Sequence, residues 1–441
     1  MSSRTAAELA AADREVLWHP FTQQQGWSRD EQPLAIARAE GTTLWDADGT
    51  SYIDGTSSLW CNVHGHRHPT IDRAVRDQLD KVAHSTMLGL THEPAITLAE
   101  RLVELAPPGL SRVFYSDNGS TANEIALKMA YQFHHQRGEW WRSGFVCLSN
   151  SYHGDTIGAV SVGGIELFHN LYRPLLFETH QAPAGDLDAM AALLGEHGDR
   201  LAAVIVEPLV QGAAGIQVMP AGYLRGVREL CDQHGIFLIC DEVATGFGRT
   251  GTMFACEQEE VTPDFLTLAK GLTGGYLPLA ATITTSRVYE GFLGAFEEFR
   301  TFFHGHTYTG NPLACAAGIA TLDVFAQERT LERLQPKLRI LGELLDEHIA
   351  PLKTVREIRR CGAMTGIQLT DFPLSARIGH RVTLEARARG AIIRPLGDTL
   401  VLMPPLSIEV PELERLVTIT SAAIAAATGA ALPRTAAPVA A

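Results

Sequence analysis

The sequence predicts an α/β protein built around a mostly parallel β-sheet. From about residue 110 onward, short β-rich runs alternate with amphipathic helical patterns, such as those over residues 187–194 and 223–234. Strand and helix in alternation imply a parallel sheet covered by helices on both faces. A chain of 441 residues, 46% of them hydrophobic, can also hold two or three domains, each with its own core. The predicted strands are residues 112–115, 145–149, 203–206, 236–240, 265–268 and 280–284.

The two ends of the chain predict a smaller α+β domain. We expect a short helix over residues 1–17 and an antiparallel meander over residues 34–54, where half-apolar runs are broken by glycine turns. A helix should follow Pro69, with a helical stretch over 312–350 and a last strand near 399–403. The predicted division is an N-terminal part of the small domain (1–68), a large domain (69–330), a C-terminal part of the small domain (331–428) and a frayed tail (429–441).

Composition excludes several classes of function. The 36 basic and 50 acidic residues give a formal net charge of −14, which argues against non-specific nucleic-acid binding. No uninterrupted apolar stretch reaches the roughly 18 residues that a membrane-spanning helix needs. The seven cysteines are dispersed without a Cys-x-x-Cys motif, which fits free thiols and gives no zinc framework. The composition therefore favours an enzyme of the reducing cytoplasm.

The clearest chemical signal is a pair of side chains at predicted strand ends. Asp241 follows the apolar run that ends at Cys240, and Lys270 follows the run 265–268. Ligands of open α/β sheets gather beyond the carboxyl ends of strands. A lysine that forms a Schiff base and a carboxylate that keeps a pyridine nitrogen protonated are what a pyridoxal phosphate enzyme requires. The segment Gly246–Gly251 also matches Gly-x-Gly-x-x-Gly, but no long helix is expected after it, which disfavours a nicotinamide-dependent dehydrogenase.

A phosphate cradle is predicted where the first strand of the large domain ends. The strand leads into a tight turn with Gly119 and a helix start, with Thr121 and Glu124 in the spacing of a capping box. The free N–H groups of a helix N-terminus bind anions, and glycine lets the backbone approach the ligand. Tyr152, after the next strand, is placed to stack on a flat ring. An ordinary strand–helix turn and an interface tyrosine are the alternative interpretations.

Two histidine clusters invite a metal interpretation. They are His64, His66 and His68, and His304 with His306. Both lie in glycine-rich loops, and no carboxylate or cysteine stands at ligand spacing beside them. We therefore predict no metal site.

Several motifs together carry a family resemblance. They are Trp18–Gln23, Ser57–His66, Asp241–Gly251, Ala269–Leu272, Thr301–Cys315, Arg394–Asp398 and Met403–Pro405. The chain resembles the class III pyridoxal-phosphate aminotransferases over most of its length. Within that class it is similar to the branch that makes 7,8-diaminononanoate from 8-amino-7-oxononanoate in biotin biosynthesis. The resemblance implies fold type I of the pyridoxal-phosphate-dependent transferases, small-molecule substrates and a homodimer with shared active sites.

The resemblance also implies residue roles, residue by residue. Lys270 would bind pyridoxal 5'-phosphate, Asp241 would pair with its ring nitrogen, and Tyr152 would complete the catalytic set. The other implied cofactor contacts are Gly119, Ser120, Glu207, Val243 and, from a partner subunit, His306 and Thr307. The implied substrate contacts are Phe21, Leu59, Trp60, Tyr152, Asp155, Arg249, Gly305 and Arg394. Arg394 as a carboxylate clamp makes independent sense, because a guanidinium binds a carboxylate through two parallel hydrogen bonds.

Two departures from the family pattern touch the amino-donor pocket. Many members that use S-adenosylmethionine carry a tyrosine after His-Pro and paired tryptophans, whereas this chain has Phe21 and Leu59-Trp60. Both changes resemble the lysine-using branch, so S-adenosylmethionine and lysine stay open as donors. The alternatives to this function are a broader class III transaminase of ω-amino acids or diamines, the dehydrogenase discussed above, and a non-catalytic cofactor-binding protein.

Overall fold

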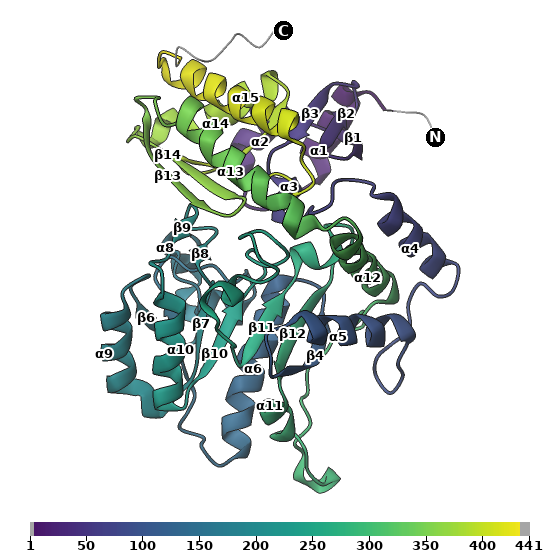
Figure 1. The fold of residues 1–441 in the computed structure, drawn as a ribbon, viewed down its shortest axis with the longest axis vertical. Coiled ribbons are helices and arrows are strands. Elements are labelled where there is room, and N and C mark those ends of the chain that lie inside the picture. The colour runs from purple at the N-terminus through teal and green to yellow at the C-terminus, as the bar shows by residue number, and fades with distance from the viewer. Residues whose placement is uncertain (1–3, 433–441) are drawn as a thin grey trace.

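A seven-stranded sheet forms the centre of the protein. Its strands are β4 (Leu110–Ser116), β5 (Gly144–Leu148), β6 (His180–Ala182), β7 (Leu201–Val206), β10 (Phe237–Asp241), β11 (Phe265–Leu268) and β12 (Ala280–Thr285). The computed structural model describes residues 4–432 and gives the order β4-β12-β11-β10-β7-β5-β6 (Figure 1). The strands from β11 to β6 pair in parallel, whereas β12 is antiparallel to both its neighbours. All six predicted strands lie in this sheet, which confirms the predicted α/β class.

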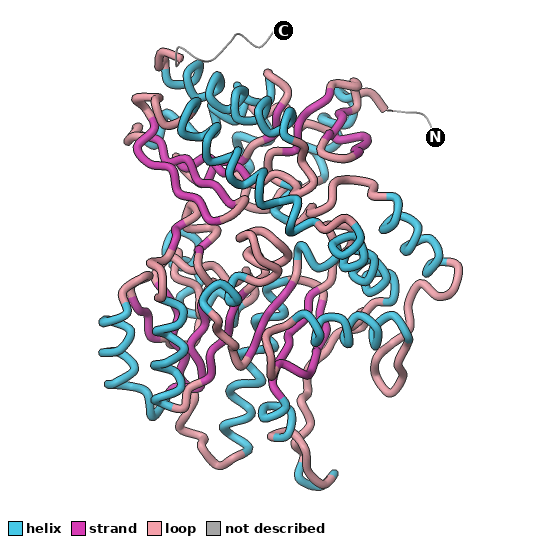
Figure 2. The backbone as a smooth tube through the Cα atoms, in the orientation of Figure 1, coloured by secondary structure: helices cyan, strands magenta, loops and turns pink. Residues whose placement is uncertain are grey.

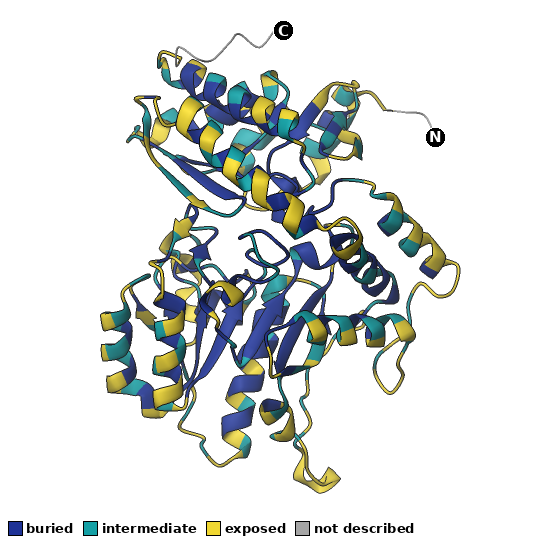
Figure 3. Ribbon diagram, viewed as in Figure 1, coloured by how far each residue is buried: buried dark blue, intermediate teal, exposed yellow. Residues whose placement is uncertain are grey.

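Helices cover both faces of this sheet (Figure 2). The covering helices are α5 (Glu93–Leu105), α6 (Gly119–Gln136), α9 (Leu187–His197), α10 (Tyr223–His234) and α12 (Pro312–Gln327). Alternate residues of one strand enter opposite cores: Val204 and Val206 pack with residues of α5, α9, α10 and α12, whereas Ala203 and Ile205 pack with residues of α6. Every residue of β7 is buried, as a strand enclosed on both faces requires (Figure 3).

The two chain ends together form a second layered unit. Its first sheet has the order β1-β2-β3-β15, with β1 (Ile36–Glu40), β2 (Thr43–Asp46), β3 (Ser51–Asp54) and β15 (Ala391–Ile392). Its second has the order β13-β14-β17-β16, with β13 (Val355–Cys361), β14 (Met364–Leu369), β17 (Thr399–Leu402) and β16 (Arg394–Leu396). Ala391 of β15 pairs in parallel with Ile53 of β3, so the two termini share one sheet. Ile53 also belongs to a core whose other members come from residues 341–427.

The other elements complete the layers. The helices are α1 (Ala6–Val16), α2 (Gln24–Arg29), α3 (Ser57–Trp60), α4 (Pro69–Leu79), α7 (Ile157–Ser161), α8 (Glu166–His169), α11 (Ser286–Glu290), α13 (Thr330–His348), α14 (Ile378–Ala388) and α15 (Val410–Thr428), and β8 (Val210–Gln211) pairs with β9 (Gln217–Val218). The predicted helix over 1–17 and the meander over 34–54 are both present, although residues 1–3 lie outside the described residues. Of the predicted tail, residues 433–441 also lie outside them. Within residues 4–432 no helix is long and apolar enough to cross a membrane.

Candidate active site

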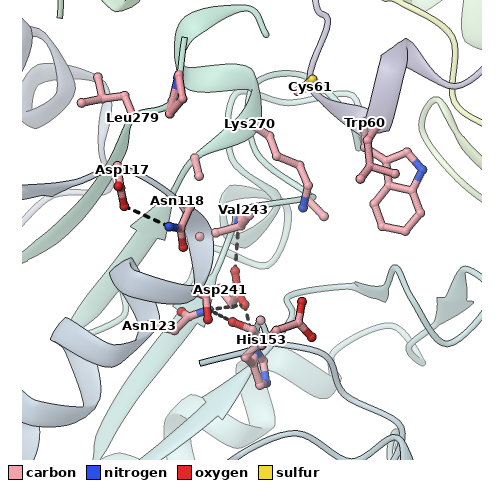
Figure 4. Close-up of a pocket in the computed structure, with 18 of the residues that line it drawn as sticks. Trp60, Cys61, Asp117, Asn118, Asn123, His153, Asp241, Val243, Lys270 and Leu279 are labelled. Atoms are coloured by element: carbon pink, nitrogen blue, oxygen red, sulfur yellow. Dashed lines mark hydrogen bonds and ion pairs between the residues drawn. The ribbon is translucent and has the colours of Figure 1, made fainter. Parts of the chain in front are cut away.

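A cavity of about 750 Å³ opens at the carboxyl ends of the parallel strands (Figure 4). The large domain contributes strand-end loops, and the segment after β3 contributes Leu59 and Trp60. Of the residues predicted for the site, those lining it are Leu59, Trp60, Gly119, Ser120, Tyr152, Asp155, Glu207, Asp241, Val243 and Lys270. The fold therefore gathers ten predicted site residues around one space.

Asp241 is the last residue of β10 and is held by several donors. Its Oδ2 atom accepts hydrogen bonds from Asn123 Nδ2 at 2.8 Å and from the ring Nδ1 of His153 at 2.7 Å. Its Oδ1 atom accepts from the backbone N–H of Val243 at 3.1 Å. The side-chain oxygen of Asn123 accepts from Thr267 Oγ1 at 2.8 Å, which fixes the orientation of the amide. A buried carboxylate that accepts these hydrogen bonds is held in one orientation and can face a positively charged group in the cavity.

Sequence reasoning missed Asn123 and His153. Both lie in segments from which other residues were predicted for the site. His153 directly follows Tyr152, and Asn123 lies in the helix that begins at Gly119. Both side chains are buried in the structure, but burial cannot be read from the sequence. Nothing local in the sequence indicates that both contact Asp241.

Lys270 begins a short 3₁₀ turn directly after β11 and Ala269. Its φ of +46° lies in the left-handed region, which costs a non-glycine residue about 1–3 kcal/mol. Its Nζ lies 5.6 Å from the centre of the Trp60 ring. Burial lowers the pKa of Lys270, while the charges of Asp241 and Glu207 oppose that shift. A lowered pKa increases the fraction of neutral amine, which is the form that can act as nucleophile and base.

Glu207 lies on the wall of the same cavity and is almost fully buried. Its two oxygens accept hydrogen bonds from the backbone N–H groups of Tyr152, at 3.1 Å, and of Gly212, at 2.8 Å. Burial is the largest effect on this carboxyl and raises its pKa from 4.5 to about 7, and Asp241 adds to the rise. Glu207 can therefore exchange a proton near neutral pH.

We expect Glu207 to make the cofactor-free protein less stable as the pH rises through neutrality. Because its pKa is raised from 4.5 to about 7, the folded protein holds this proton more tightly than the unfolded chain. The resulting stabilisation is fully present below pH 4.5 and is lost as the pH rises through about 7. The melting temperature, followed by calorimetry across this range, should fall more steeply for the natural protein than for Glu207→Gln. Equal slopes for the two proteins would contradict the assignment.

The phosphate cradle differs in detail from the one predicted. The helix α6 begins at Gly119 with Asn118 as its N-cap, whose side chain accepts from the backbone N–H of Thr121. The predicted capping box of Thr121 with Glu124 is therefore wrong, since Thr121 is the third residue of the helix. Glu124 instead accepts from the backbone N–H of Gly158 at 2.7 Å. The helix thus starts one turn nearer the cavity than expected, and its first N–H groups are closer to any bound anion.

The residues around the cavity fit pyridoxal phosphate. A Cβ atom on Gly119 would lie 2.6 Å from Val243 Cγ1, so only glycine lets the helix start approach this side chain. Ser120 Oγ lies beside it, 2.8 Å from Thr156 Oγ1. An anion site, a buried carboxylate and a buried amine line one space, which matches the phosphate, ring nitrogen and aldehyde of that cofactor.

Tyr152 and Asp155 lie on another part of the cavity wall. The Tyr152 hydroxyl donates to Asp155 Oδ2 at 2.6 Å. Burial, together with that carboxylate, raises the pKa of Tyr152, so the hydroxyl stays protonated. The ring is thereby fixed in place as one wall for a flat ligand.

Six predicted residues do not line the cavity. Phe21 is an exposed residue whose ring lies 6.5 Å from that of Tyr152, and Arg394 is half-buried in β16. Gly305, His306 and Thr307 lie in the loop before α12 and away from this chain's own cavity.

Arg249 departs most from its predicted place in the substrate pocket. It is 1% exposed and donates to the backbone oxygens of Asn62 and Pro404, each at 2.8 Å. Its guanidinium therefore joins two chain segments behind the cavity wall. Burial lowers the pKa of Arg249 to about 10. Two of its five N–H donors are thus taken by backbone carbonyls, and its Nε is buried without a partner among the described residues.

The histidine clusters take other partners. The ring of His64 contacts the backbone oxygen of Thr321 at 3.1 Å, and that of His66 contacts Asp54 at 2.9 Å. The ring nitrogen of His304 lies 3.0 Å from Lys128 Nζ. Across residues 4–432, no three histidine, cysteine, aspartate or glutamate side chains gather closely enough to hold a metal ion.

Comparison with known proteins agrees with this geometry. Residues 26–424 match the family described as aminotransferase class III. Two curated relatives, from Nitratidesulfovibrio vulgaris and Aquifex aeolicus, are both named adenosylmethionine-8-amino-7-oxononanoate aminotransferase. The first is 57% identical, over 97% of this chain and 83% of its own length, and the second is 51% identical, over 92% and 94%.

Solved structures place the fold in the same class. The adenosylmethionine-8-amino-7-oxononanoate aminotransferase of Methanocaldococcus jannaschii superposes with a TM-score of 0.93 at 43% identity, covering 94% of this chain and 98% of its own. An (S)-enantioselective omega-transaminase of Thermomicrobium roseum superposes with a TM-score of 0.92 at 33% identity, covering 97% and 100%. The matching family, the fold type I architecture and the buried lysine and aspartate agree, and the chain belongs to the class III aminotransferases, which depend on pyridoxal phosphate.

Proposed function

We propose that this enzyme transfers an amino group to 8-amino-7-oxononanoate and so forms 7,8-diaminononanoate for biotin biosynthesis. The observation that supports it most is the agreement of the curated relatives, named for that reaction, with a cavity that holds Lys270, Asp241 and Trp60 together. The relevant assay offers the purified, cofactor-loaded enzyme this keto acid together with S-adenosylmethionine or lysine as amino donor, and follows the diamine by mass spectrometry. If pyruvate or 2-oxoglutarate is accepted and 8-amino-7-oxononanoate is not, the proposal fails.

The reaction divides between the cofactor and the residues of the chain. Bound pyridoxal phosphate supplies an electron sink, which makes the proton on the amine-bearing carbon of the donor acidic. Lys270, with its lowered pKa, takes that proton and returns it at the neighbouring position. Asp241 would pair with the protonated ring nitrogen, and Asn123 and His153 keep its carboxylate in place. Tyr152 and Val243 would confine the ring of the bound cofactor, and the start of α6 would hold its phosphate.

We propose Arg394 as the group that binds the substrate carboxylate. It is half-buried in β16, and burial lowers its pKa. A half-buried guanidinium without a carboxylate partner among the described residues offers a site for a carboxylate ligand.

Replacing Arg394 by alanine should raise the KM for 8-amino-7-oxononanoate about 10- to 100-fold, because hydrogen bonds to a charged group contribute about 1.5–3 kcal/mol. The kcat should change much less, since the clamp contacts a part of the substrate that does not react. Steady-state kinetics with Arg394→Ala and Arg394→Lys tests this expectation. Arg394→Lys keeps the positive charge but loses the bidentate contact, so its KM should lie between those of the natural enzyme and Arg394→Ala. An unchanged KM for the keto acid in Arg394→Ala would remove the clamp role.

The amino donor is proposed to be S-adenosylmethionine, with lysine as the alternative. The names of the curated relatives favour the first, whereas Phe21 and Leu59 resemble the lysine-using branch. The exposed Phe21 ring packs 5.5 Å from that of Phe168, at the side of the cavity that Tyr152 bounds. A single-turnover assay that follows conversion of the bound cofactor to its amine form, with each donor alone, separates the two. If neither donor converts the cofactor, only the broader assignment to the class III aminotransferases stands.

We also propose a homodimer with shared active sites and the domain division predicted from the sequence. Thr307 is exposed, so its side chain is accessible to a phosphate bound in a partner subunit. Exposed apolar side chains in the same loop include Phe299 and Phe303. Light scattering should give twice the chain mass, and a mass equal to one chain would exclude the shared site.

A broader ω-transaminase remains the second candidate. The omega-transaminase of Thermomicrobium roseum superposes over 97% of the chain at 33% identity, so the fold alone does not choose between these substrates. The choice depends on the cavity side chains Leu59 and Trp60 and on the proposed carboxylate clamp Arg394, and the acceptor assay described above decides it.

A further inference from the structure

The segment that carries Leu59 and Trp60 into the cavity has a strained backbone. Ser57, Ser58 and Trp60 have φ values of +51°, +61° and +64°, although none is a glycine. Such values are uncommon for residues with a side chain, and they persist only where the surroundings hold them in place. Three positive φ values within residues 57–60 indicate that the surroundings hold this wall of the cavity in a single backbone conformation.

The neighbours of this segment leave it little room. A Cβ atom on Gly212 would lie 3.0 Å from Trp60 Cζ3, and one on Gly275 would lie 3.0 Å from the backbone nitrogen of Asn62. From the other side, Ser57 Oγ donates to the backbone oxygen of Met403 at 2.7 Å. These contacts confine the segment, but they do not pair the N–H groups at its strained turn.

Asp54, the last residue of β3, pairs those groups. It is fully buried, and its carboxylate accepts from the backbone N–H of Thr56 at 3.2 Å and from that of Ser58 at 2.9 and 3.0 Å. Its Oδ2 atom also contacts the ring Nε2 of His66 at 2.9 Å. His66 is itself anchored by backbone bonds to Gly41 in both directions. The loop that carries His66 thus holds the Asp54 carboxylate, and this carboxylate in turn holds the backbone at Thr56 and Ser58.

We propose that the Asp54–His66 pair is a positioning device that keeps residues 57–60 in their strained conformation and so sets where Leu59 and Trp60 stand over Lys270. Neither residue lines the cavity, so the pair acts through the wall rather than on the substrate. Asp54 supplies the acceptor that the turn needs, and His66 prevents that carboxylate from rotating away. Only the expected change in KM for 8-amino-7-oxononanoate rests on the proposed function.

The test compares Asp54→Asn with Asp46→Asn. Asp46 is a matched control, because it is also buried in the small sheet and accepts from the backbone N–H groups of Asp48 and Thr50, at 3.0 and 2.8 Å, but it does not touch residues 57–60. Hydrogen–deuterium exchange of residues 57–62 in the cofactor-loaded enzyme without substrate should be about tenfold faster in Asp54→Asn, since a buried N–H group loses a charged acceptor. The KM for the keto acid should rise by about the same factor with a smaller change in kcat.

His66 variants provide the second arm, should Asp54→Asn not fold. His66→Leu removes the ring N–H and should reproduce the faster exchange, whereas His66→Gln keeps a donor and should restore it toward the natural rate. Natural exchange rates in both Asp54→Asn and His66→Leu, or the same acceleration in Asp46→Asn, would overturn the proposal. The exchange rates are measured without substrate. If the enzyme rejects 8-amino-7-oxononanoate, the proposed function is refuted, but the exchange rates still test the Asp54–His66 pair.

Discussion

Replacing Lys270 by alanine is expected to abolish turnover. General acid–base catalysis by a positioned side chain contributes about 10²–10⁴-fold, and the loss of the amine also removes the group that holds the cofactor. Lys270 is the lysine that lines the cavity, with Nζ 5.6 Å from the centre of the Trp60 ring. After borohydride reduction, the natural protein should carry the cofactor covalently on the peptide that contains Lys270, and Lys270→Ala should carry none.

The matched control for this experiment is Lys353→Ala, since Lys353 is exposed between α13 and β13 and far along the chain from the site. It should keep both turnover and the label. Labelling of Lys270→Ala at another lysine, with turnover retained, would show that the catalytic amine had been assigned to the wrong residue. A melting temperature for each variant separates loss of the amine from loss of the fold.

Replacing Asp241 by asparagine should lower turnover about 10²–10⁴-fold, because removing one partner of a buried charge pair costs about 3–5 kcal/mol and each 1.4 kcal/mol is tenfold in rate. The shape is conserved, but the charge that should stabilise the protonated ring nitrogen is lost. Asn123 Nδ2 and His153 Nδ1, which now contact Asp241 Oδ2, would then face an amide that can match only part of their hydrogen bonding. Turnover and the absorbance spectrum of the bound cofactor should change together.

Asp232→Asn is a suitable control for the charge change. Asp232 forms an ion pair with Arg228 on α10, but its side chain is 68% exposed, so its loss should leave turnover unaltered. Turnover of Asp241→Asn close to the natural rate would mean that this carboxylate does not face the ring nitrogen. Identical absorbance spectra of the bound cofactor in Asp241→Asn and Asp232→Asn would also mean that Asp241 does not face the ring nitrogen.

Local patterns predicted most of the scaffold. A buried strand shows itself as a short apolar run, so six of the seven strands of the central sheet, and the polar residues at their ends, could be located from the sequence. Asp241 and Lys270 stood out because each follows such a run. The start of α6 was placed less well, because Asn118 and Thr121 are both good capping residues and the spacing of Thr121 and Glu124 suited the wrong one.

The sequence by itself determined the fold class, the family and the residues at the strand ends, since each of these follows from neighbouring residues and their periodicity. Only the tertiary structure decided which side chains meet. Asn123 and His153 contact Asp241 across 118 and 88 positions of the chain, Arg249 turns to backbone oxygens instead of the substrate pocket, and Asp54 holds the strained wall of the cavity. Hydrogen bonds of this kind depend on separations of a few tenths of an ångström between distant segments, and these are set by packing rather than by local pattern.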